Sequence, residues 1–447
     1  GISAGGAIAN EFGGTLSVSR SHFEDNSSLG VVAAVGGAIT SDLGATVDAE
    51  GNVGSTDPPV VHVSRSHFEG NVAQSQTGYV DAPDAAFSGV AGGGAILNVT
   101  GQMTVSRSHF ENNSVQGGNA IAGDENLPDS TSGGAGLGGA ILSGNLSPFG
   151  LAQSSLRVSR STFENNSATG GSGVIEVDEP PAVPGGLATG GAVAVGNGTY
   201  ARLERNLFRY NSVQGGPGGG VAEGGIGTGG AASAADTATL RSERNRFAEN
   251  TAEGGAGSGV ENDAAGRGGA VGLDTVPQFG FGKTILPDGS TPFAGPAIGS
   301  SKFDTFHGNQ AYGGIGGGIY NEGDLSIKGS TLAENQAIGL ATVSIEFVPG
   351  YSFVGVGLGG GVSNIGSLDI KNATFEANEA IGGHDADGAN FFTDGFANYA
   401  GLGVGGGLHN ITQASVKNSH FFGNGAIGGD NNIGSFAGVG NGGGIYN

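Results

Sequence analysis

The chain has 447 residues, 95 of them glycine and none of them cysteine, and it carries a net charge of −23. Collagen is excluded, because the chain has only 14 prolines and its glycines do not recur every three residues. The absence of cysteine excludes a disulfide framework. The acidic balance disfavours nucleic acid and anionic lipid as partners, and no apolar run approaches the roughly 18 residues of a membrane span.

A motif of the form Leu-x-Val-x-x-Ser-x-Phe-x-x-Asn recurs along the chain, with substitutions at several positions. Its phenylalanine position is occupied by Phe23, Phe68, Phe110, Phe163, Phe208, Phe247, Phe306, Leu332, Phe375 and Phe421. Its asparagine position is occupied by Asn26, Asn71, Asn113, Asn166, Asn211, Asn250, Asn309, Asn335, Asn378 and Asn424. The alternating apolar residues predict strands of about three to five residues with one buried face.

A second motif, Gly-Gly followed by a small and then an aliphatic residue, alternates with the first. Its copies end at Ile8, Ile39, Ile96, Ile141, Val193, Ala232, Val271, Ile319, Val362, Leu408 and Ile445. Glycine tolerates the positive φ of tight turns, so these copies mark corners. The regular alternation predicts a repeat architecture, in which each copy depends on its neighbours for stability.

The spacing of the copies predicts the architecture. The shortest interval, from Phe306 to Leu332, is 26 residues, which suits one coil of three short strands. We therefore expect an all-β fold, a right-handed parallel β-helix of about ten to eleven coils with long glycine-rich loop insertions. Equivalent residues would stack about 4.8 Å apart, with an asparagine ladder at one corner. The alternative is a β-propeller, but its blades need four strands and each copy has room for three.

We expect one solenoid over residues 1–447, with a degraded copy around Phe306. This copy separates two sub-families of repeats, at residues 1–260 and 310–447. Arginine precedes the phenylalanine by three positions in the first sub-family, whereas Lys328, Lys371 and Lys417 stand one position earlier in the second. A change of partner surface at the split is one interpretation, and sequence drift is the other.

At its Gly-Gly-Ala-Ile and Phe-x-x-Asn motifs, the sequence resembles the repeat region of the chlamydial polymorphic outer membrane proteins. It is also similar to the wider pectate-lyase-like superfamily of right-handed β-helices. The resemblance covers essentially residues 1–447 and implies a surface-exposed or secreted protein, commonly an adhesin. No C-terminal β-barrel translocator follows the repeats in this sequence and its loops are unusually rich in glycine, so the secretion route stays open.

Residues beside the inward phenylalanines are expected to point outward and to form columns of their own. One column is basic and one is acidic: Arg20, Arg65, Arg107, Arg160, Arg205 and Arg244, and Glu24, Glu69, Glu111 and Glu164. We expect a ladder of exposed ion pairs between the two columns, each pair contributing less than about 1 kcal/mol.

Three histidines, His22, His67 and His109, precede the phenylalanine in the first three copies. They are expected to stack on the outer face beside the glutamates. Imidazole and carboxylate together suit a transition metal. A solvated strand face is the plainer interpretation, because a flat face does not turn its ligands inward.

One acidic turn has the pattern of a cation site. Asp385, Asp387 and Asn390 place oxygen ligands at intervals around a glycine, like the first half of a calcium loop, although no glutamate closes it. Calcium is therefore a candidate ion, a plain acidic turn is the alternative, and no other cofactor is expected. We assign no catalytic residue, because the outward columns obey the repeat and active sites tend to break one.

Most insertions fall between the asparagine corner and the next Gly-Gly motif, so they are expected to form an acidic, glycine-rich ridge on one side. Its aromatic residues are Tyr79, Phe87, Phe347, Tyr351, Phe353, Phe391, Phe392, Phe396, Tyr399 and Phe436. Exposed loop aromatics favour a glycan or protein partner. The alternative is that they fold back over the solenoid wall.

These patterns predict an extracellular or cell-surface protein with a structural or adhesive role rather than an enzyme. Both ends of the sequence fall inside a Gly-Gly motif without a capping element, which favours end-to-end stacking of copies into a fibre or a segment of a longer chain. Two further alternatives are a polysaccharide lyase or hydrolase of the β-helix type and a monomeric adhesin that binds through the loop ridge.

Overall fold

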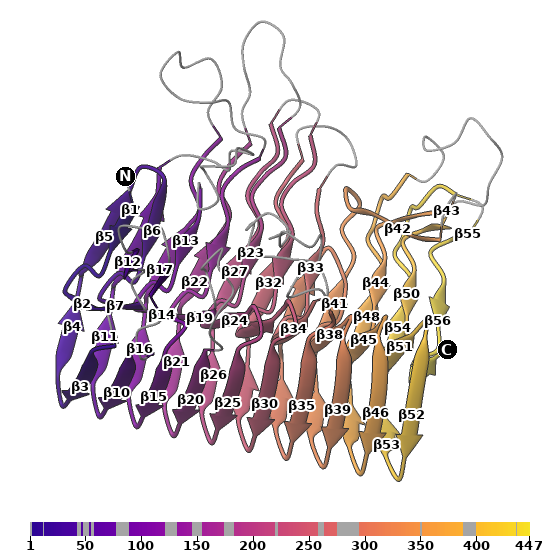
Figure 1. Ribbon diagram of the computed structural model, residues 1–447. Coiled ribbons are helices and arrows are strands. Elements are labelled where there is room, and N and C mark those ends of the chain that lie inside the picture. The colour runs from indigo at the N-terminus through magenta and orange to yellow at the C-terminus, as the bar shows by residue number, and fades with distance from the viewer. Residues whose placement is uncertain are drawn as a thin grey trace, which may run out of the picture.

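The computed structural model describes residues 2–11, 13–42, 46–47, 53–54, 58–76, 89–120, 132–144, 154–173, 183–219, 222–257, 263–274, 295–348, 351–387, 399–434 and 436–447. Within these ranges the regular structure consists of short strands without a helix. Figure 1 shows the strands stacked coil upon coil from the N-terminus to the C-terminus. The chain is a right-handed parallel β-helix, as the repeats predict.

Five parallel sheets run along the solenoid, numbered here in the order in which each coil visits them. Sheet 1 consists of β3 (Thr15–Ser19), β10 (Val60–Ser64), β15 (Gln102–Ser106), β20 (Ser155–Ser159), β25 (Tyr200–Glu204), β30 (Thr239–Glu243), β35 (Ile298–Lys302), β39 (Asp324–Lys328), β46 (Ser367–Lys371) and β52 (Gln413–Lys417). Sheet 2 consists of β4 (His22–Glu24), β11 (His67–Glu69), β16 (His109–Glu111), β21 (Thr162–Glu164), β26 (Leu207–Arg209), β31 (Arg246–Ala248), β36 (Thr305–His307), β40 (Thr331–Ala333), β47 (Thr374–Glu376) and β53 (His420–Phe422). Sheet 3 consists of β5 (Ser27–Gly30), β12 (Val72–Ser75), β17 (Ser114–Gln116), β22 (Ser167–Thr169), β27 (Ser212–Gln214), β32 (Thr251–Glu253), β37 (Gln310–Tyr312), β41 (Gln336–Ile338), β48 (Glu379–Ile381) and β54 (Gly425–Ile427).

Sheets 4 and 5 are formed around the Gly-Gly motifs. Sheet 4 has one stack of β1 (Ile2–Ala4), β6 (Ala33–Val35), β13 (Ala91–Gly92), β18 (Gly136–Leu137), β23 (Ala188–Thr189), β28 (Gly227–Thr228) and β33 (Gly266–Arg267), and a second of β44 (Gly357–Leu358), β50 (Gly403–Val404) and β56 (Gly440–Asn441). Sheet 5 consists of β2 (Ile8–Glu11), β7 (Ile39–Asp42), β14 (Ile96–Val99), β19 (Ile141–Gly144), β24 (Val193–Gly196), β29 (Ala232–Ala234), β34 (Val271–Leu273), β38 (Ile319–Asn321), β45 (Val362–Asn364), β51 (Leu408–Asn410) and β57 (Ile445–Tyr446). Two small sheets lie in the insertions: β8 (Thr46–Val47) with β9 (Val53–Gly54), and β42 (Ser344–Val348), β43 (Tyr351–Val354), β49 (Tyr399–Ala400) and β55 (Phe436–Ala437).

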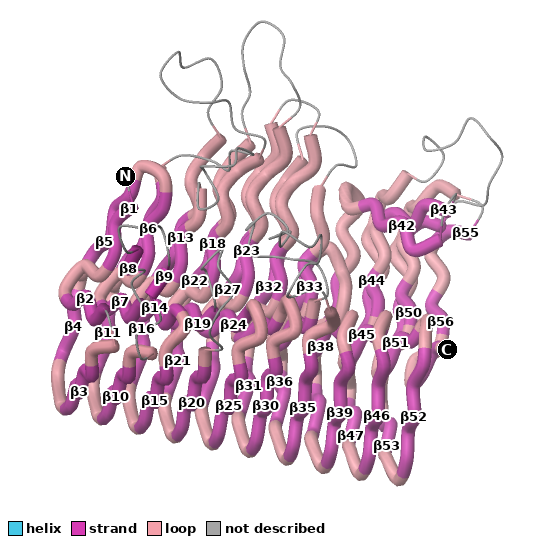
Figure 2. Tube along the Cα trace, viewed as in Figure 1, coloured by secondary structure: helices cyan, strands magenta, loops and turns pink. Residues whose placement is uncertain are grey.

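The expectation of three strands in a coil was wrong, because a typical coil contributes a short strand to each of five sheets (Figure 2). The glycine-rich stretch that reads as a corner forms the two-residue strands of sheet 4. Along the chain, most of the long insertions follow a strand of sheet 3 and precede a strand of sheet 4, as the sequence predicts, whereas the insertions after β7 and β34 connect sheet 5 to sheet 1.

The phenylalanine column is the centre of the hydrophobic core. From Phe23 to Phe306 and again from Phe375 to Phe421, successive rings stack with centroids 4.5–4.9 Å apart. Leu332 takes the same inward position between Phe306 and Phe375 and is fully buried. The aliphatic residues of sheets 1 and 5 pack around these rings in one continuous cluster.

The asparagine ladder runs beside the core from Asn26 to Asn424. The side-chain Nδ2 of each asparagine donates to Oδ1 of the next over nine consecutive steps, at 2.8–2.9 Å. Each Oδ1 also accepts the backbone N–H of the preceding asparagine, and from Asn71 onward Nδ2 also donates to a phenylalanine-position carbonyl of the previous coil. Every amide inside the ladder is therefore satisfied without water.

A second polar column lies two residues before the phenylalanines. Its first members are Ser21, Ser66, Ser108 and Ser161, and Asn206 and Asn245 follow. The Oγ of each serine after the first accepts a hydrogen bond from the backbone N–H of the serine in the preceding coil. The Oδ1 atoms of the two asparagines accept in the same way. Asp304 follows, and its Oδ1 accepts the N–H of Asn245 at 2.7 Å while Ser301 Oγ donates to its Oδ2 at 2.8 Å. Burial raises the pKa of Asp304 to about 6, despite these hydrogen bonds.

Replacing Asp304 by asparagine is expected to stabilise the protein above pH 6. The folded-state pKa of about 6 lies above the ordinary value of 3.8, so the contribution of Asp304 to stability is fully present below pH 4 and is lost as the pH rises through 6. The loss is up to about 3 kcal/mol. An asparagine side chain at this position would continue the amides of Asn206 and Asn245 without a charge. Denaturation at pH 4 and pH 8 measures the effect, and equal stabilisation at both pH values would contradict it.

The two glycines of the second motif have different tasks, as Gly190 and Gly191 show. Gly190 has φ of 60°, in the left-handed region that disfavours other residues. At Gly191 a Cβ atom would lie 2.1 Å from the carbonyl oxygen of Gly230 in the next coil. The first glycine turns the chain, and the second lets adjacent coils approach.

Replacing Gly191 by alanine is expected to destabilise the protein by about 2–3 kcal/mol, because the added methyl group must push two backbones apart. The matched control is Gly144→Ala in β19, where the nearest atom to a Cβ would be 3.6 Å away. Urea denaturation followed by circular dichroism compares the two variants. Equal midpoints for both would show that the coils can separate at little cost.

The degraded copy coincides with an irregularity of the solenoid. Gly299 stands where other copies carry an inward aliphatic residue, and the side chains of Leu273 and Leu325 occupy the space beside it. In this region sheet 4 is interrupted, and its two stacks are linked by single bridges from Arg267 to Ile315 and from Ile315 to Leu358. The interruption extends from β33 to β44, so it includes the degraded copy around Phe306.

Candidate functional site

Sheet 1 and the corner that follows it carry most of the basic residues of the molecule. In each five-residue strand the second and fourth residues face the core, so the first, third and fifth face outward. The third position aligns Arg157, Arg202 and Arg241 on adjacent strands. The fifth position aligns Lys302, Lys328, Lys371 and Lys417, and the arginine column that ends at Arg244 occupies the corner directly after the strands.

The segregation of charge is strong. Sheet 1 and its following corner hold 13 of the 17 basic residues, namely Arg20, Arg65, Arg107, Arg157, Arg160, Arg202, Arg205, Arg241, Arg244, Lys302, Lys328, Lys371 and Lys417. The same segments hold five carboxylates of 40, Glu204, Glu243, Asp304, Asp324 and Asp369. Their net charge is therefore +8 (13 minus 5), whereas the rest of the chain carries −31 (4 minus 35). We call these segments the basic face.

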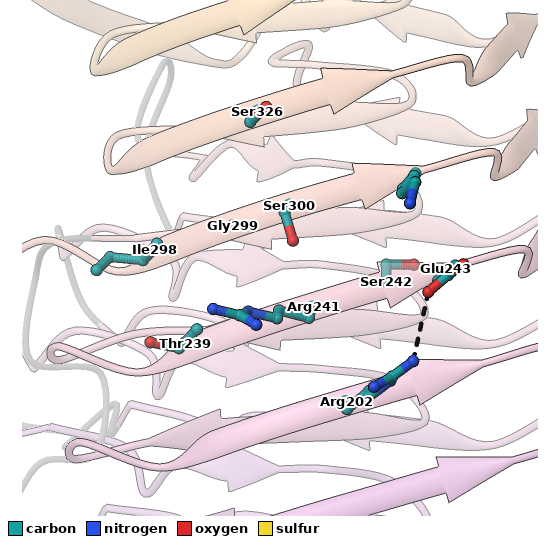
Figure 3. Close-up of a pocket in the computed structure, with 10 residues that line it drawn as sticks. Arg202, Thr239, Arg241, Ser242, Glu243, Ile298, Gly299, Ser300 and Ser326 are labelled. Carbon is teal, nitrogen blue, oxygen red and sulfur yellow. Dashed lines mark hydrogen bonds and ion pairs between the residues drawn. The ribbon is translucent and has the colours of Figure 1, made fainter.

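A groove of about 470 Å³ lies on the basic face over β30 and β35. Figure 3 shows Arg202, Arg241 and Ser300 on successive strands, projecting from the same side of the sheet. The lining also includes Lys302, together with the apolar side chain of Ile298. A second depression of about 190 Å³ continues along the face between Arg157 and Arg205.

The carboxylates of Glu204 and Glu243 form ion pairs with the arginines of this region. Arg202 Nη2 lies 3.3 Å from Glu204 and 3.4 Å from Glu243, as the dashed line to Glu243 in Figure 3 marks. Arg157 lies 3.7 Å from Glu204 and its side chain is 58% exposed, whereas that of Glu204 is 16% exposed. The guanidinium groups are therefore fixed in place but still open to solvent, which suits recognition of anions.

The predicted ladder of arginine–glutamate pairs is not what the structure shows. Glu24, Glu69 and Glu111 lie beside His22, His67 and His109 at 3.7, 3.2 and 3.0 Å, and Glu164 pairs with Arg209 at 2.6 Å. Arg205 and Arg244 pair with the preceding glutamates of sheet 1. The arginine column occupies the left-handed corner between sheets 1 and 2, with φ of 49–56°, whereas the glutamates stand at the far end of the sheet 2 strands.

The predicted calcium turn is described only in part. Asp385 and Asp387 lie on a turn that stacks on the next coil, where the Asp385 N–H donates to the carbonyl of Asp430 at 2.9 Å and the Ala386 N–H donates to Asn432 Oδ1 at 2.7 Å. Asn390 lies outside the described residues. Calcium binding at this turn stays a prediction.

Three of the predicted loop aromatics pack against one another. Phe353, Tyr399 and Phe436 stack with ring centroids 4.7 and 5.0 Å apart, on strands β43, β49 and β55. Phe353 and Tyr399 also pack against the buried aliphatic residues beneath them. Phe353 and Tyr399 thus fold back over the wall of the solenoid, whereas Phe436 is 49% exposed. The side chains of Tyr79, Phe87, Phe347, Tyr351, Phe391, Phe392 and Phe396 lie outside the described part of the structure.

A buried ionic cluster beside the interruption of sheet 4 has no signal in the repeat pattern. Arg267 Nη1 lies 3.5 Å from Glu322 and 3.8 Å from Asp274, and its guanidinium stacks over the ring of Tyr320. Tyr320 donates a hydrogen bond to Glu322, and burial raises the pKa of its hydroxyl well above the usual value. One cation thus joins two acidic groups from neighbouring coils, which is a structural arrangement.

No stretch of the described chain forms a helix with the length and apolarity that crossing a bilayer requires. Searches of protein-family models, of curated proteins and of solved structures found no match to this chain.

Proposed function

We propose that the chain is an extracellular structural and adhesive solenoid that binds linear polyanions, such as acidic glycans, along its basic face. The observation that carries this proposal is the concentration of 13 basic residues on one face of a molecule whose net charge is −23. A positively charged strip on a negatively charged molecule concentrates negatively charged ligands along the strip.

The spacing of the cations favours a long ligand over a small one. Adjacent coils repeat every 4.5–4.9 Å, as the phenylalanine stack shows, so the arginines and lysines form rows parallel to the solenoid axis. Lys302 and Lys328 lie in register, and like charges at this spacing repel each other. A polymer with regularly spaced carboxylates or sulfates offsets that repulsion along the whole row.

We propose binding without turnover. The carboxylates nearest the groove, Glu204 and Glu243, are both engaged by arginine, whereas glycoside hydrolysis needs two carboxyl groups flanking the sugar. The polysaccharide lyase or hydrolase is therefore the less supported alternative.

The test compares two double variants with the same change of charge. Binding of heparin and of polygalacturonate is measured by biolayer interferometry for Arg202→Gln with Arg241→Gln, and for Arg209→Gln with Arg246→Gln on sheet 2. The first pair should weaken binding about tenfold and reduce its salt dependence, while the second should leave both nearly unchanged. Equal losses would show that binding follows net charge alone, and absence of binding to either polymer would overturn the proposal. Release of reducing or unsaturated sugar ends would favour the enzyme instead.

We also propose that coils of successive copies stack end to end. Each coil pairs with the next through parallel strands of the five sheets, and a strand edge of this kind accepts another strand. Electron microscopy over a concentration series should show filaments one solenoid wide, and a uniform population of monomers at high concentration would remove this part of the proposal.

A further inference from the structure

The outer face of the first three strands of sheet 2 carries a column of paired imidazoles and carboxylates. Strands β4, β11 and β16 each read His-Phe-Glu, with the phenylalanine in the core. The histidine and the glutamate therefore share the outward side. The register places the three histidines side by side and the three glutamates side by side.

The ligand atoms in this column are close enough to share an ion. The imidazole rings are 4.7 Å apart between His22 and His67 and 4.9 Å apart between His67 and His109. The Nε2–Oε2 distance is 3.2 Å from His67 to Glu69 and 3.0 Å from His109 to Glu111. Two groups result, His22–His67–Glu69 and His67–His109–Glu111, and within each group the three ligand atoms lie within 4.8 Å of one another.

These distances fit a tetrahedral transition metal after small side-chain rotations. Zinc binds nitrogen and oxygen at about 2.0–2.2 Å, which separates two of its ligands by about 3.3 Å. The histidine–glutamate pairs of the second and third coils already lie close to this separation. The side chains of His22 and His67 are 52% and 32% exposed, so the imidazole of the neighbouring coil has room to rotate.

The fourth coil of the column differs from the first three in the cation that faces its glutamate. In the fourth coil Thr162 replaces the histidine, and Glu164 pairs with Arg209 at 2.6 Å. In the first three coils, the described residues that pair with the glutamates are histidines instead of an arginine. A bound divalent ion offsets the repulsion between stacked carboxylates and uses neutral imidazole, its preferred form as a ligand.

We propose that this column binds one divalent transition-metal ion, such as zinc or nickel, through His67, one neighbouring histidine and one glutamate. His67 belongs to both groups, so a single ion occupies one of two overlapping positions and water completes its coordination. The ion ties adjacent coils together at the outer surface. This proposal is independent of polyanion binding, because it uses sheet 2 and none of the arginines of the groove.

Calorimetry with zinc chloride and with nickel chloride on untagged protein tests the site. We expect one ion for each chain. His67→Gln should weaken binding more than tenfold, whereas His22→Gln and His109→Gln alone should each weaken it only a few-fold, because one group survives. The double variant His22→Gln with His109→Gln should lose binding like His67→Gln.

The matched control is His307→Gln, which removes a histidine of the same sheet that faces a single glutamate, Glu334, at 4.0 Å. Its affinity for zinc should equal that of the parent chain. The absorption spectrum of bound cobalt reports nitrogen and oxygen ligands directly, and circular dichroism confirms that each variant is folded. Absence of binding, or a parent-like affinity of folded His67→Gln, would overturn the proposal.

Discussion

Replacing Asn211 by alanine is expected to cost about 3–5 kcal/mol of unfolding free energy. The change deletes the donors to Asn250 Oδ1 and to the carbonyl of Phe163, and it removes the oxygen that accepts from both nitrogens of Asn166. Each buried polar group left without a partner costs about 1–3 kcal/mol. Guanidinium denaturation followed by circular dichroism measures the loss.

The neighbouring Asn165 provides the control for this variant. Its side chain is exposed and its φ is 53°, so Asn165→Gly should be nearly neutral. Hydrogen exchange should show faster opening around Asn211 than in coils distant from it, because each repeat is supported chiefly by its neighbours. A shift of less than about 1 kcal/mol for Asn211→Ala would mean that water replaces the missing amide and that the ladder is dispensable.

Replacing Phe208 by alanine is expected to destabilise the protein by about 3–5 kcal/mol, because it leaves a cavity between two stacked rings. Phe208 is fully buried, with Phe163 4.8 Å and Phe247 4.9 Å away. Phe208→Leu should cost only about 1–1.5 kcal/mol, because Leu332 already fills the same position of another coil. Thermal and chemical denaturation of both variants measure the difference. Equal losses would show that ring stacking, rather than filled volume, stabilises the column.

The inner columns could be predicted from the sequence because they depend only on local spacing. The step from Phe23 to Asn26 repeats in every copy, whatever the length of the loop that follows, and the column positions of both residues are confirmed. The strands of sheet 4 could not be predicted, because stretches such as Gly136–Leu137 carry no alternating side chains. They pair only because the coils on both sides hold them in register.

The arginine column at the corner of the basic face was predicted, but the outward arginines within the strands of sheet 1 were missed for a different reason. Arg157, Arg202 and Arg241 stand in register, but loops that differ between the copies separate them along the chain, and serine, threonine, histidine or aspartate takes the position in other copies. The polar column that contains Asp304 was also missed, because its position holds serine in some copies, asparagine in others and aspartate in this one. Aligning the copies on the strand that precedes each phenylalanine would have found both features.

The asparagine ladder also gives the solenoid a direction. All nine side-chain hydrogen bonds run in the same sense, from Nδ2 of one coil to Oδ1 of the coil that follows. The side-chain dipoles therefore add along the axis, and the two ends of the column differ chemically, one offering an acceptor and the other a donor. Any further coil, from whichever chain it comes, can extend the ladder only in the same orientation. Two solenoids that met with identical ends would bring acceptor against acceptor or donor against donor, so the ladder allows only a head-to-tail orientation.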